Sequence, residues 1–134
     1  MDISQLKNVI RKGTISTVDG ARCCARVVFE DKEDLVSDEL PILLPFSFGS
    51  KGYWLPEVGT PVVCVFTMNP SGNGLTDGFV VGAYYDDDHP PAEINPDVRS
   101  IRFPDGSYLR YDHGDIELHA SGNVVITGAK VNIN

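Results

Sequence analysis

The length, composition and charge of the chain exclude several classes of protein. Its 134 residues fit one ordinary domain, or a small domain with an appendage, and 42% hydrophobic against 22% charged residues is typical of globular proteins. The net charge of −8 repels phosphate backbones, so no nucleic acid is expected as a partner. No apolar run approaches the ~18 residues of a membrane span, and the first residues lack an apolar signal core, so we expect synthesis and assembly in a cytoplasm.

The first thirteen residues predict a short helix. Asp2 and Gln5 resemble a capping box, and a basic pair before Gly13 supplies a stop. One helical face collects the apolar residues Ile3, Leu6 and Ile10. A helix this short is marginal in water, so we expect it to lie on the body that follows.

The next part of the chain predicts five short strands. A hairpin crosses Asp19-Gly20, a dipeptide suited to a type I′ turn, and the acidic stretch 31–39 is expected to be a solvated loop. The predicted strands are 14–18, 21–30, 40–46, 62–68 and 79–85. The second strand carries an apolar row that predicts a core face: Ala21, Cys23, Ala25, Val27 and Phe29. Five short strands without an internal helix predict a small closed barrel of the OB type.

The three cysteines are expected to be small buried hydrophobes. Their number is odd and no Cys-x-x-Cys spacing occurs, which disfavours both a zinc site and a disulfide framework. They lie in apolar strand patterns with no histidine nearby in sequence, so nothing supports nucleophilic activation.

Three aspartates followed by His89, Pro90 and Pro91 break the strand pattern. We therefore predict an OB-fold domain with an N-terminal helix at 1–88, a stiff linker at 89–100 and a second β-structure at 101–134. Its short alternating strands are expected at 101–103, 108–112, 115–120, 123–127 and 130–134, separated by glycine-containing turns.

The strands of the second β-structure have inward pairs of apolar residues that no part of the sequence is expected to cover. The pairs are Leu109 with Tyr111, Ile116 with Leu118, Val124 with Ile126, and Val131 with Ile133. A lone narrow sheet leaves its edges and one apolar face open, so this segment should not fold alone. Wrapping identical copies around a common axis would bury every pair, and we predict a homotrimer with these eight residues as its core.

Several short motifs follow one another in a familiar order. They are YWLPEVG at 53–59, VVCVF at 62–66, GFVVGAYY at 78–85, PP at 90–91, PDGS at 104–107 and LRYD at 109–112. Over nearly its whole length the chain resembles the baseplate assembly protein V family, the central spikes of contractile phage tails. Related spikes belong to type VI secretion systems and contractile bacteriocins.

The resemblance implies a mechanical function without chemical catalysis or a cofactor. The barrel would lie at the baseplate hub, in contact with tail tube and baseplate proteins. Three C-terminal segments would wind into an intertwined β-helix or β-prism that pierces a target cell envelope when the sheath contracts. The protein would be assembled in the bacterial cytoplasm and become part of a phage tail or phage-tail-like particle.

The last residues depart from the family pattern. Many members close the spike with a His-x-His pair that holds iron, whereas this chain has the separate histidines His89, His113 and His119 and ends in Ile133-Asn134. No metal is therefore expected. An open end would expose apolar side chains and strand edges, so Ile133 and Asn134 are predicted to contact a separate tip-capping protein. The resemblance identifies this cap as a small conical protein rich in Pro-Ala-Ala-Arg repeats.

Several short motifs can be interpreted either as ligand or catalytic sites or as ordinary turns and linkers. The set Asp105, Asp112, His113 and Asp115 fits a cation site or a hydrolytic pair, but turn chemistry is simpler. Residues 86–88 fit either a cation site on a trimer axis or a solvated linker. The segment 49–52 hints at a phosphate loop but lacks its full spacing.

Trp54 leaves open a second function. As an aromatic on an OB barrel it could stack on a base or a sugar, although a buried anchor beside Tyr53 and Leu55 is the simpler interpretation. The alternative function is thus an OB-fold binding module for oligosaccharide or single-stranded nucleic acid, with the C-terminal segment as a trimerisation device.

Overall fold

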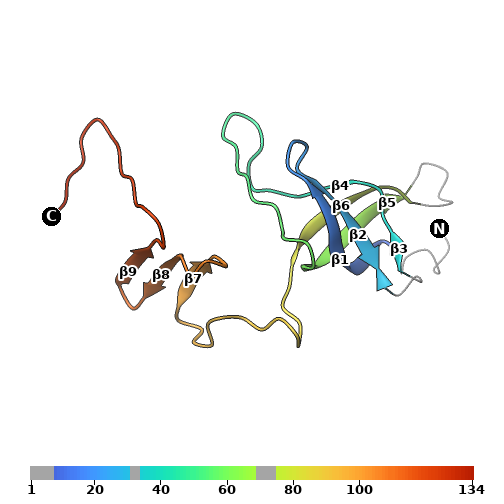
Figure 1. Cartoon of the computed structure of the whole chain (residues 1–134). Helices are drawn as coiled ribbons and strands as arrows, with labels where there is room; N and C mark the ends of the chain where they lie inside the picture. Colours follow the sequence, from blue (N-terminus) through green and yellow to red (C-terminus); the bar gives the residue numbers. More distant parts are fainter. Residues whose placement is uncertain (1–7, 31–33, 69–74) are drawn as a thin grey trace. The chain divides into compact units, whose positions relative to one another are not determined.

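The computed structural model describes residues 8–30, 34–68 and 75–134, which form two compact units (Figure 1). The boundary between the units lies between His89 and Pro90. Each unit contains one antiparallel sheet, and no α-helix occurs among the described residues. The all-β prediction is confirmed for this part of the chain.

The first unit is built on a highly twisted sheet with the order β3-β2-β1-β5-β6, and β4 also pairs with β2. Its strands are β1 (Ile10–Asp19), β2 (Cys24–Phe29), β3 (Leu35–Val36), β4 (Leu40–Pro41), β5 (Pro61–Met68) and β6 (Leu75–Ala83). The β1–β2 hairpin and the strand at 62–68 follow the prediction, but the hairpin loop lies at 20–23 instead of at Asp19-Gly20, and β2 begins at Cys24 instead of Ala21. β3 instead lies inside the acidic stretch that was predicted to be a loop.

The predicted N-terminal helix is wrong where the structure describes it. Residues 1–7 lie outside the described part, but Ile10 begins a strand and pairs with Val65 of β5. Gly13 packs so closely on β2 that a Cβ atom there would lie 2.4 Å from Val27 Cγ1. Sheet pairing of this segment therefore overrides the helical spacing of its apolar residues.

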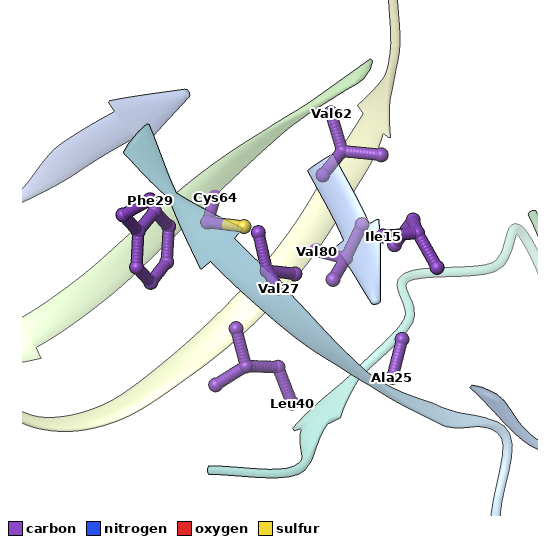
Figure 2. Close-up of a cluster of buried hydrophobic side chains, with 8 residues drawn as sticks. All are labelled: Ile15, Ala25, Val27, Phe29, Leu40, Val62, Cys64 and Val80. Atoms are coloured by element: carbon purple, nitrogen blue, oxygen red, sulfur yellow. The ribbon is translucent and has the colours of Figure 1, made fainter. Parts of the chain in front are cut away.

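The core of the first unit lies on one face of the sheet (Figure 2). Alternation along β2 buries Ala25, Val27 and Phe29, as the apolar row predicts. Among the described residues, the buried cluster is Ile15, Ala25, Val27, Phe29, Leu40, Val62, Cys64 and Val80.

Two of the three cysteines are buried as predicted, and the third is not. Cys24 and Cys64 are buried, whereas Cys23 is half-buried in the β1–β2 turn with a φ of 52°. Burial raises the pKa of the Cys64 thiol to about 11, against the opposing effect of the Arg11 charge. Cys64 therefore behaves as a small core residue.

Regular strand pairing does not close this sheet into a barrel among the described residues. One isolated parallel bridge joins Ile42 to Val80, and the amide of Leu43 donates to the Val80 carbonyl at 3.0 Å. The predicted strand at 40–46 is reduced to Leu40–Pro41, since Pro41 and Pro45 cannot donate to a ladder.

The second unit is a three-stranded meander in the order β7-β8-β9. Its strands are β7 (Arg99–Arg102), β8 (Tyr108–Asp112) and β9 (Asp115–His119). His113 and Gly114 join β8 to β9 with φ angles of 48° and 96°, which fits a type I′ turn. Between β7 and β8, Gly106 has a φ of 93°, as in a turn with a bulge.

The structure contains no strand at residues 120–134, so the strands predicted at 123–127 and 130–134 are not formed within one described chain. Their alternating residues fit strands, but a strand needs a neighbour to pair with. Residues 90–98, predicted as part of a linker, include contacts to the meander through Glu93.

Candidate assembly surface of the second unit

The register of the meander separates its side chains into two faces. Leu109 lies opposite both Ile101 and Leu118, and Tyr111 lies opposite Ile116. Because side chains alternate along each strand, these five share one side of the sheet. Arg99, which lies opposite Tyr111, is at one end of the same side. We call the five apolar residues of this side the apolar face: Ile101, Leu109, Tyr111, Ile116 and Leu118.

The apolar face is the exposed side of the meander. Ile116 is 75% exposed and Leu118 is 64% exposed, while Ile101, Leu109 and Tyr111 are each at least 40% exposed. The neighbouring residues of β8, Tyr108, Arg110 and Asp112, are half-buried on the other side. This is the reverse of the usual arrangement in a globular domain. A contiguous exposed apolar surface of this kind marks an interaction site.

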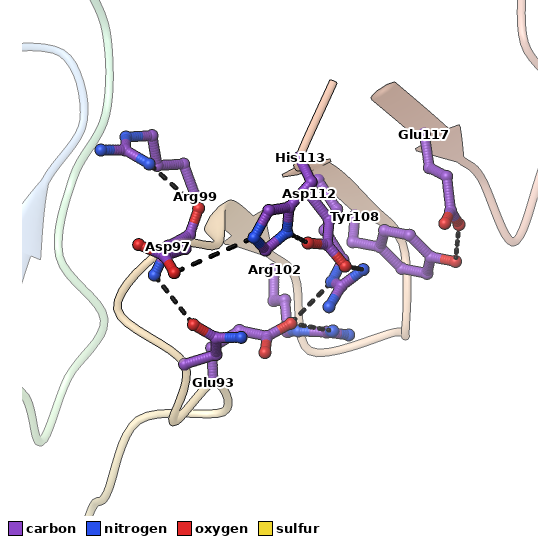
Figure 3. Close-up of polar contacts among 10 residues, drawn as sticks. Glu93, Asp97, Arg99, Arg102, Tyr108, Asp112, His113 and Glu117 are labelled. Atoms are coloured by element: carbon purple, nitrogen blue, oxygen red, sulfur yellow. Dashed lines mark hydrogen bonds and ion pairs between the residues drawn. The ribbon is translucent and has the colours of Figure 1, made fainter. Parts of the chain in front are cut away.

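Glu93 lies on the polar side of the meander, where two arginines bind it (Figure 3). Arg110 Nε donates to Glu93 Oε1 at 2.7 Å, and Arg102 donates to the same oxygen at 3.2 Å. The hydrogen bonds from Arg110 and then Arg102 lower the pKa of Glu93, and the bond to Glu93 raises the pKa of Arg110. We call this group the Glu93 clamp: Glu93, Arg102 and Arg110.

Further polar contacts continue across this side. Asp112 accepts from the Arg110 guanidinium at 3.4 Å and is bonded to His113 Nδ1, and the His113 bond lowers the pKa of Asp112. Tyr108 donates its hydroxyl to Glu117 Oε2 at 2.9 Å, which raises the pKa of Tyr108, and its ring stacks on His119. The polar side thus has partners within one chain, whereas the apolar face is left exposed.

The segment that follows β9 is tied to the β7–β8 turn at its start. Ser121 donates its hydroxyl to Asp105 Oδ2 at 2.9 Å, and its amide donates to Ser107 Oγ at 3.0 Å. The amide of Ser107 donates to Asp105 Oδ1, and together with Ser121 it lowers the pKa of Asp105. Beyond this attachment, Val124, Ile126, Val131 and Ile133 are all exposed, the last to 90%.

The acidic and histidine residues considered as a cation or catalytic site have other roles in the structure. Asp105 organises a turn with serines, and Asp112 binds His113 and Arg110. Among residues 8–30, 34–68 and 75–134, no group of three or more His, Cys, Asp or Glu side chains lies close enough to hold a metal ion. Their observed contacts are those of turn chemistry.

The eight residues predicted for a trimer core share one property here, which is that a single chain buries none of them. Four lie on the apolar face and four lie in the segment after β9. Their role in a trimer stays a prediction. Two residues of the second unit were not identified from the sequence. Ile101 of the apolar face could have been found from its alternation with Phe103. Glu93 has no local signal, because its partner Arg110 is distant in sequence.

Trp54 is not the buried anchor that the sequence predicts. It is 54% exposed, and its neighbour Tyr53 reaches the β1–β2 turn, where its hydroxyl donates to the Gly20 carbonyl at 3.2 Å. Trp54 lines a groove on the first unit together with Ile42, Pro56, Val81 and Tyr85.

Two loops considered as ligand sites are ordinary turns. In the segment 46–52, Ser47 pairs with Lys51, and the amide of Gly52 donates to the Phe46 carbonyl at 2.9 Å. Asp86 accepts from the amide of His89 and is bonded to its ring, each at 2.8 Å, and the ring contact lowers the pKa of Asp86. Both arrangements close a turn within the chain.

Nothing in the described part of the chain is a helix with the length and hydrophobicity to cross a membrane.

Comparisons with known proteins point to one kind of phage component. No protein-family model matches the chain. Over 119 residues it is 30% identical to the protein called Spike protein of Escherichia phage P2. The match covers 87% of this chain and 52% of the phage P2 protein, so the chain spans about half the length of that relative. This likeness supports a relationship to phage spike proteins.

Proposed function

We propose that the chain is a structural subunit of the central spike of a contractile phage-type tail and that it acts as a homotrimer. The observation that carries the proposal is the apolar face, which is exposed while the polar-side residues of the central strand β8 are half-buried. Burying a large aliphatic side chain stabilises an assembly by roughly 1.5 to 3 kcal/mol. Three apolar faces turned toward a common axis therefore provide both a reason for their exposure and a means of assembly.

The two units divide the work in this proposal. The first unit has its own buried core and lies at the hub. Regular strand pairing leaves its sheet open, and the OB-type barrel of this proposal is supported by the parallel bridge between Ile42 and Val80. It contacts tail tube and baseplate proteins. The second unit and the segment after it form an intertwined β-helical shaft that pierces the target envelope without catalysis, as in the baseplate assembly protein V family.

Two further parts of the proposal concern the particle. The subunit is assembled in the bacterial cytoplasm and becomes part of a phage tail or phage-tail-like particle. Ile133 and Asn134 contact a separate tip-capping protein. The 90% exposure of Ile133 supports that contact, since exposed apolar surface marks interaction sites.

Light scattering coupled to size-exclusion chromatography tests the proposal. The expected mass is three times the 14.6 kDa of one chain and is maintained on dilution. A monomer would contradict the proposal, provided that its second unit remains folded by amide hydrogen exchange.

A second candidate function rests on the exposure of Trp54 and Tyr85 along the groove of the first unit. Exposed aromatics in a groove suit stacking on sugars or unpaired bases. Trp54 is the single tryptophan of the chain, so its fluorescence reports on the groove directly. The spike proposal predicts no change in this fluorescence on titration with a chito-oligosaccharide or oligothymidylate. A saturable change would favour the binding-module function.

A further inference from the structure

The meander of the second unit has two open edges. The order β7-β8-β9 places β7 and β9 at opposite ends of the sheet, and no described strand pairs with the outer side of either. Unpaired edges present backbone donors and acceptors to any strand that approaches. Natural proteins usually protect such edges, so two open edges beside an exposed apolar face call for an explanation.

The two edges carry opposite charge. β7 has the sequence RSIR, with Arg102 on the polar side, Arg99 on the side of the apolar face, and no acid. β9 has the sequence DIELH, with Asp115 and Glu117 on the polar side and no lysine or arginine. Two β7 edges would repel each other, as would two β9 edges, while β7 against β9 is attractive. The charges therefore favour a head-to-tail contact between copies over a two-fold contact.

We infer that β9 of one copy pairs with β7 of the next, so that three meanders close into one nine-stranded ring at the start of the shaft, from which residues 120–134 continue as the proposed β-helix. This inference rests on the proposed homotrimer and specifies how its copies join. In a meander β7 and β9 run in the same direction. Rotation about a common axis leaves the direction of each strand along that axis unchanged. The new ladder is therefore parallel, whereas every ladder within the meander is antiparallel.

The number of strands explains why the ring has three members. A closed barrel of about eight strands has an interior just wide enough for side chains to fill it. Three strands from each of three copies make nine, the multiple of three nearest to that size. Two copies would give six strands with too little room for the apolar face, and four would give twelve with an unfilled interior.

The sidedness of the meander fits the same ring. The Glu93 clamp lies on the polar side, which then faces outward. The apolar face points to the axis, with Arg99 at one end of the interior. Arg102 and Glu117 both lie on the polar side, near the proposed seam. Each retains bonding capacity, because a guanidinium has five donors and a carboxylate has about four acceptor positions. Their contacts with Glu93 and Tyr108 use only part of it.

Disulfide cross-linking of the two edges tests the inference in the full chain. Ser100→Cys is combined in turn with Asp115→Cys, Glu117→Cys and His119→Cys, which samples the register of the new ladder. Within one copy the edges are two strand spacings apart, about 9 to 10 Å, which is too far for a disulfide. A Cys23→Ser background removes the half-buried native thiol.

The head-to-tail ring predicts covalent trimers on a non-reducing gel for at least one cysteine pair. Each matching single-cysteine variant should give only monomers. Covalent dimers from a single-cysteine variant would instead show a two-fold contact and overturn the inference. Trimers by light scattering that no pair cross-links would also overturn it while leaving the proposed homotrimer intact. A monomeric protein would end both proposals.

Charge reversal supplies an independent test. Glu117→Arg should raise the concentration at which half of the trimer dissociates by roughly tenfold or more, because it repeats a repulsive pair at three seams. Adding Arg102→Glu to this variant restores an attractive pair between positions 102 and 117 of neighbouring copies. The dissociation concentration should then return most of the way to that of the unchanged protein, with Arg110 still bound to Glu93. Tyr108→Phe removes the internal bond to Glu117 without changing charge and should leave the dissociation concentration unchanged. No recovery in the double variant would count against the seam.

Discussion

Replacing Ile116 with serine tests whether the apolar face is buried between copies. Ile116 is 75% exposed in one chain, and full burial of an isoleucine side chain contributes roughly 1.5 to 3 kcal/mol. Three-quarters of that amount, counted for three copies, is about 3 to 7 kcal/mol for each trimer. The dissociation constant of the trimer should therefore rise by roughly two to five powers of ten.

Sedimentation equilibrium over a range of protein concentrations measures this change directly. Ile94→Ser is the matched control, because Ile94 belongs to the same unit and is 95% exposed but lies outside the meander. The control should assemble like the unchanged protein. Equal assembly of Ile116→Ser and Ile94→Ser would refute the reasoning that the apolar face lies between copies.

Three further predictions concern other parts of the chain. Gly78→Ala should destabilise the first unit by about 1 to 3 kcal/mol in urea unfolding, because its Cβ would lie 2.3 Å from Phe66, whereas Gly82→Ala meets nothing within 4 Å and should be tolerated. The lowered pKa of Glu93 means that the clamp adds stability above the usual glutamate pKa and loses it as the pH falls through the lower folded-state pKa. Glu93→Gln should remove that part of the acid sensitivity in urea midpoints measured from pH 7 downward, and an unchanged pH profile would contradict the role of the clamp. Ile133→Asp should weaken co-purification of a tip protein, while circular dichroism should show that the first unit stays folded. A native particle whose tip is closed by this chain alone would contradict the cap.

Local sequence patterns predicted those strands in which alternating apolar residues directly indicate a buried face. The alternation of Ala25, Val27 and Phe29 marks a core face, and the structure buries all three. The run at 62–68 and the turn at His113-Gly114 also match, because their backbone requirements are local. The type I′ turn predicted at Asp19-Gly20 is wrong, since Asp19 pairs with Cys24 and the loop at 20–23 has its positive φ at Cys23. These elements need no knowledge of distant partners.

Elements that depend on distant contacts were harder to predict. The helical spacing at the N-terminus extends to Ile10. In the structure, however, Ile10 pairs with β5 and Gly13 packs closely on Val27, so this segment is a strand. The pairing of Glu93 with Arg110 spans 17 positions and has no sequence signature. Trp54 was expected to be buried because a large aromatic usually is, yet its surroundings leave half of it exposed.

The residues after β9 show a different limit. Val124, Ile126, Val131 and Ile133 alternate as strand residues do, but a single described chain gives them neither strand pairing nor burial. Alternation predicts which side chains would share a face, whereas the ladder itself requires a neighbouring strand. In the proposed homotrimer, that neighbour belongs to another copy of the chain.

A density map of the purified full-length assembly would show directly whether the apolar face is buried between copies. We predict three copies around one axis, with Leu109, Ile116 and Leu118 pointing toward it and the Glu93 clamp on the outside. A map that shows a different number of copies, or three copies with the apolar face turned to solvent, would contradict the proposed homotrimer.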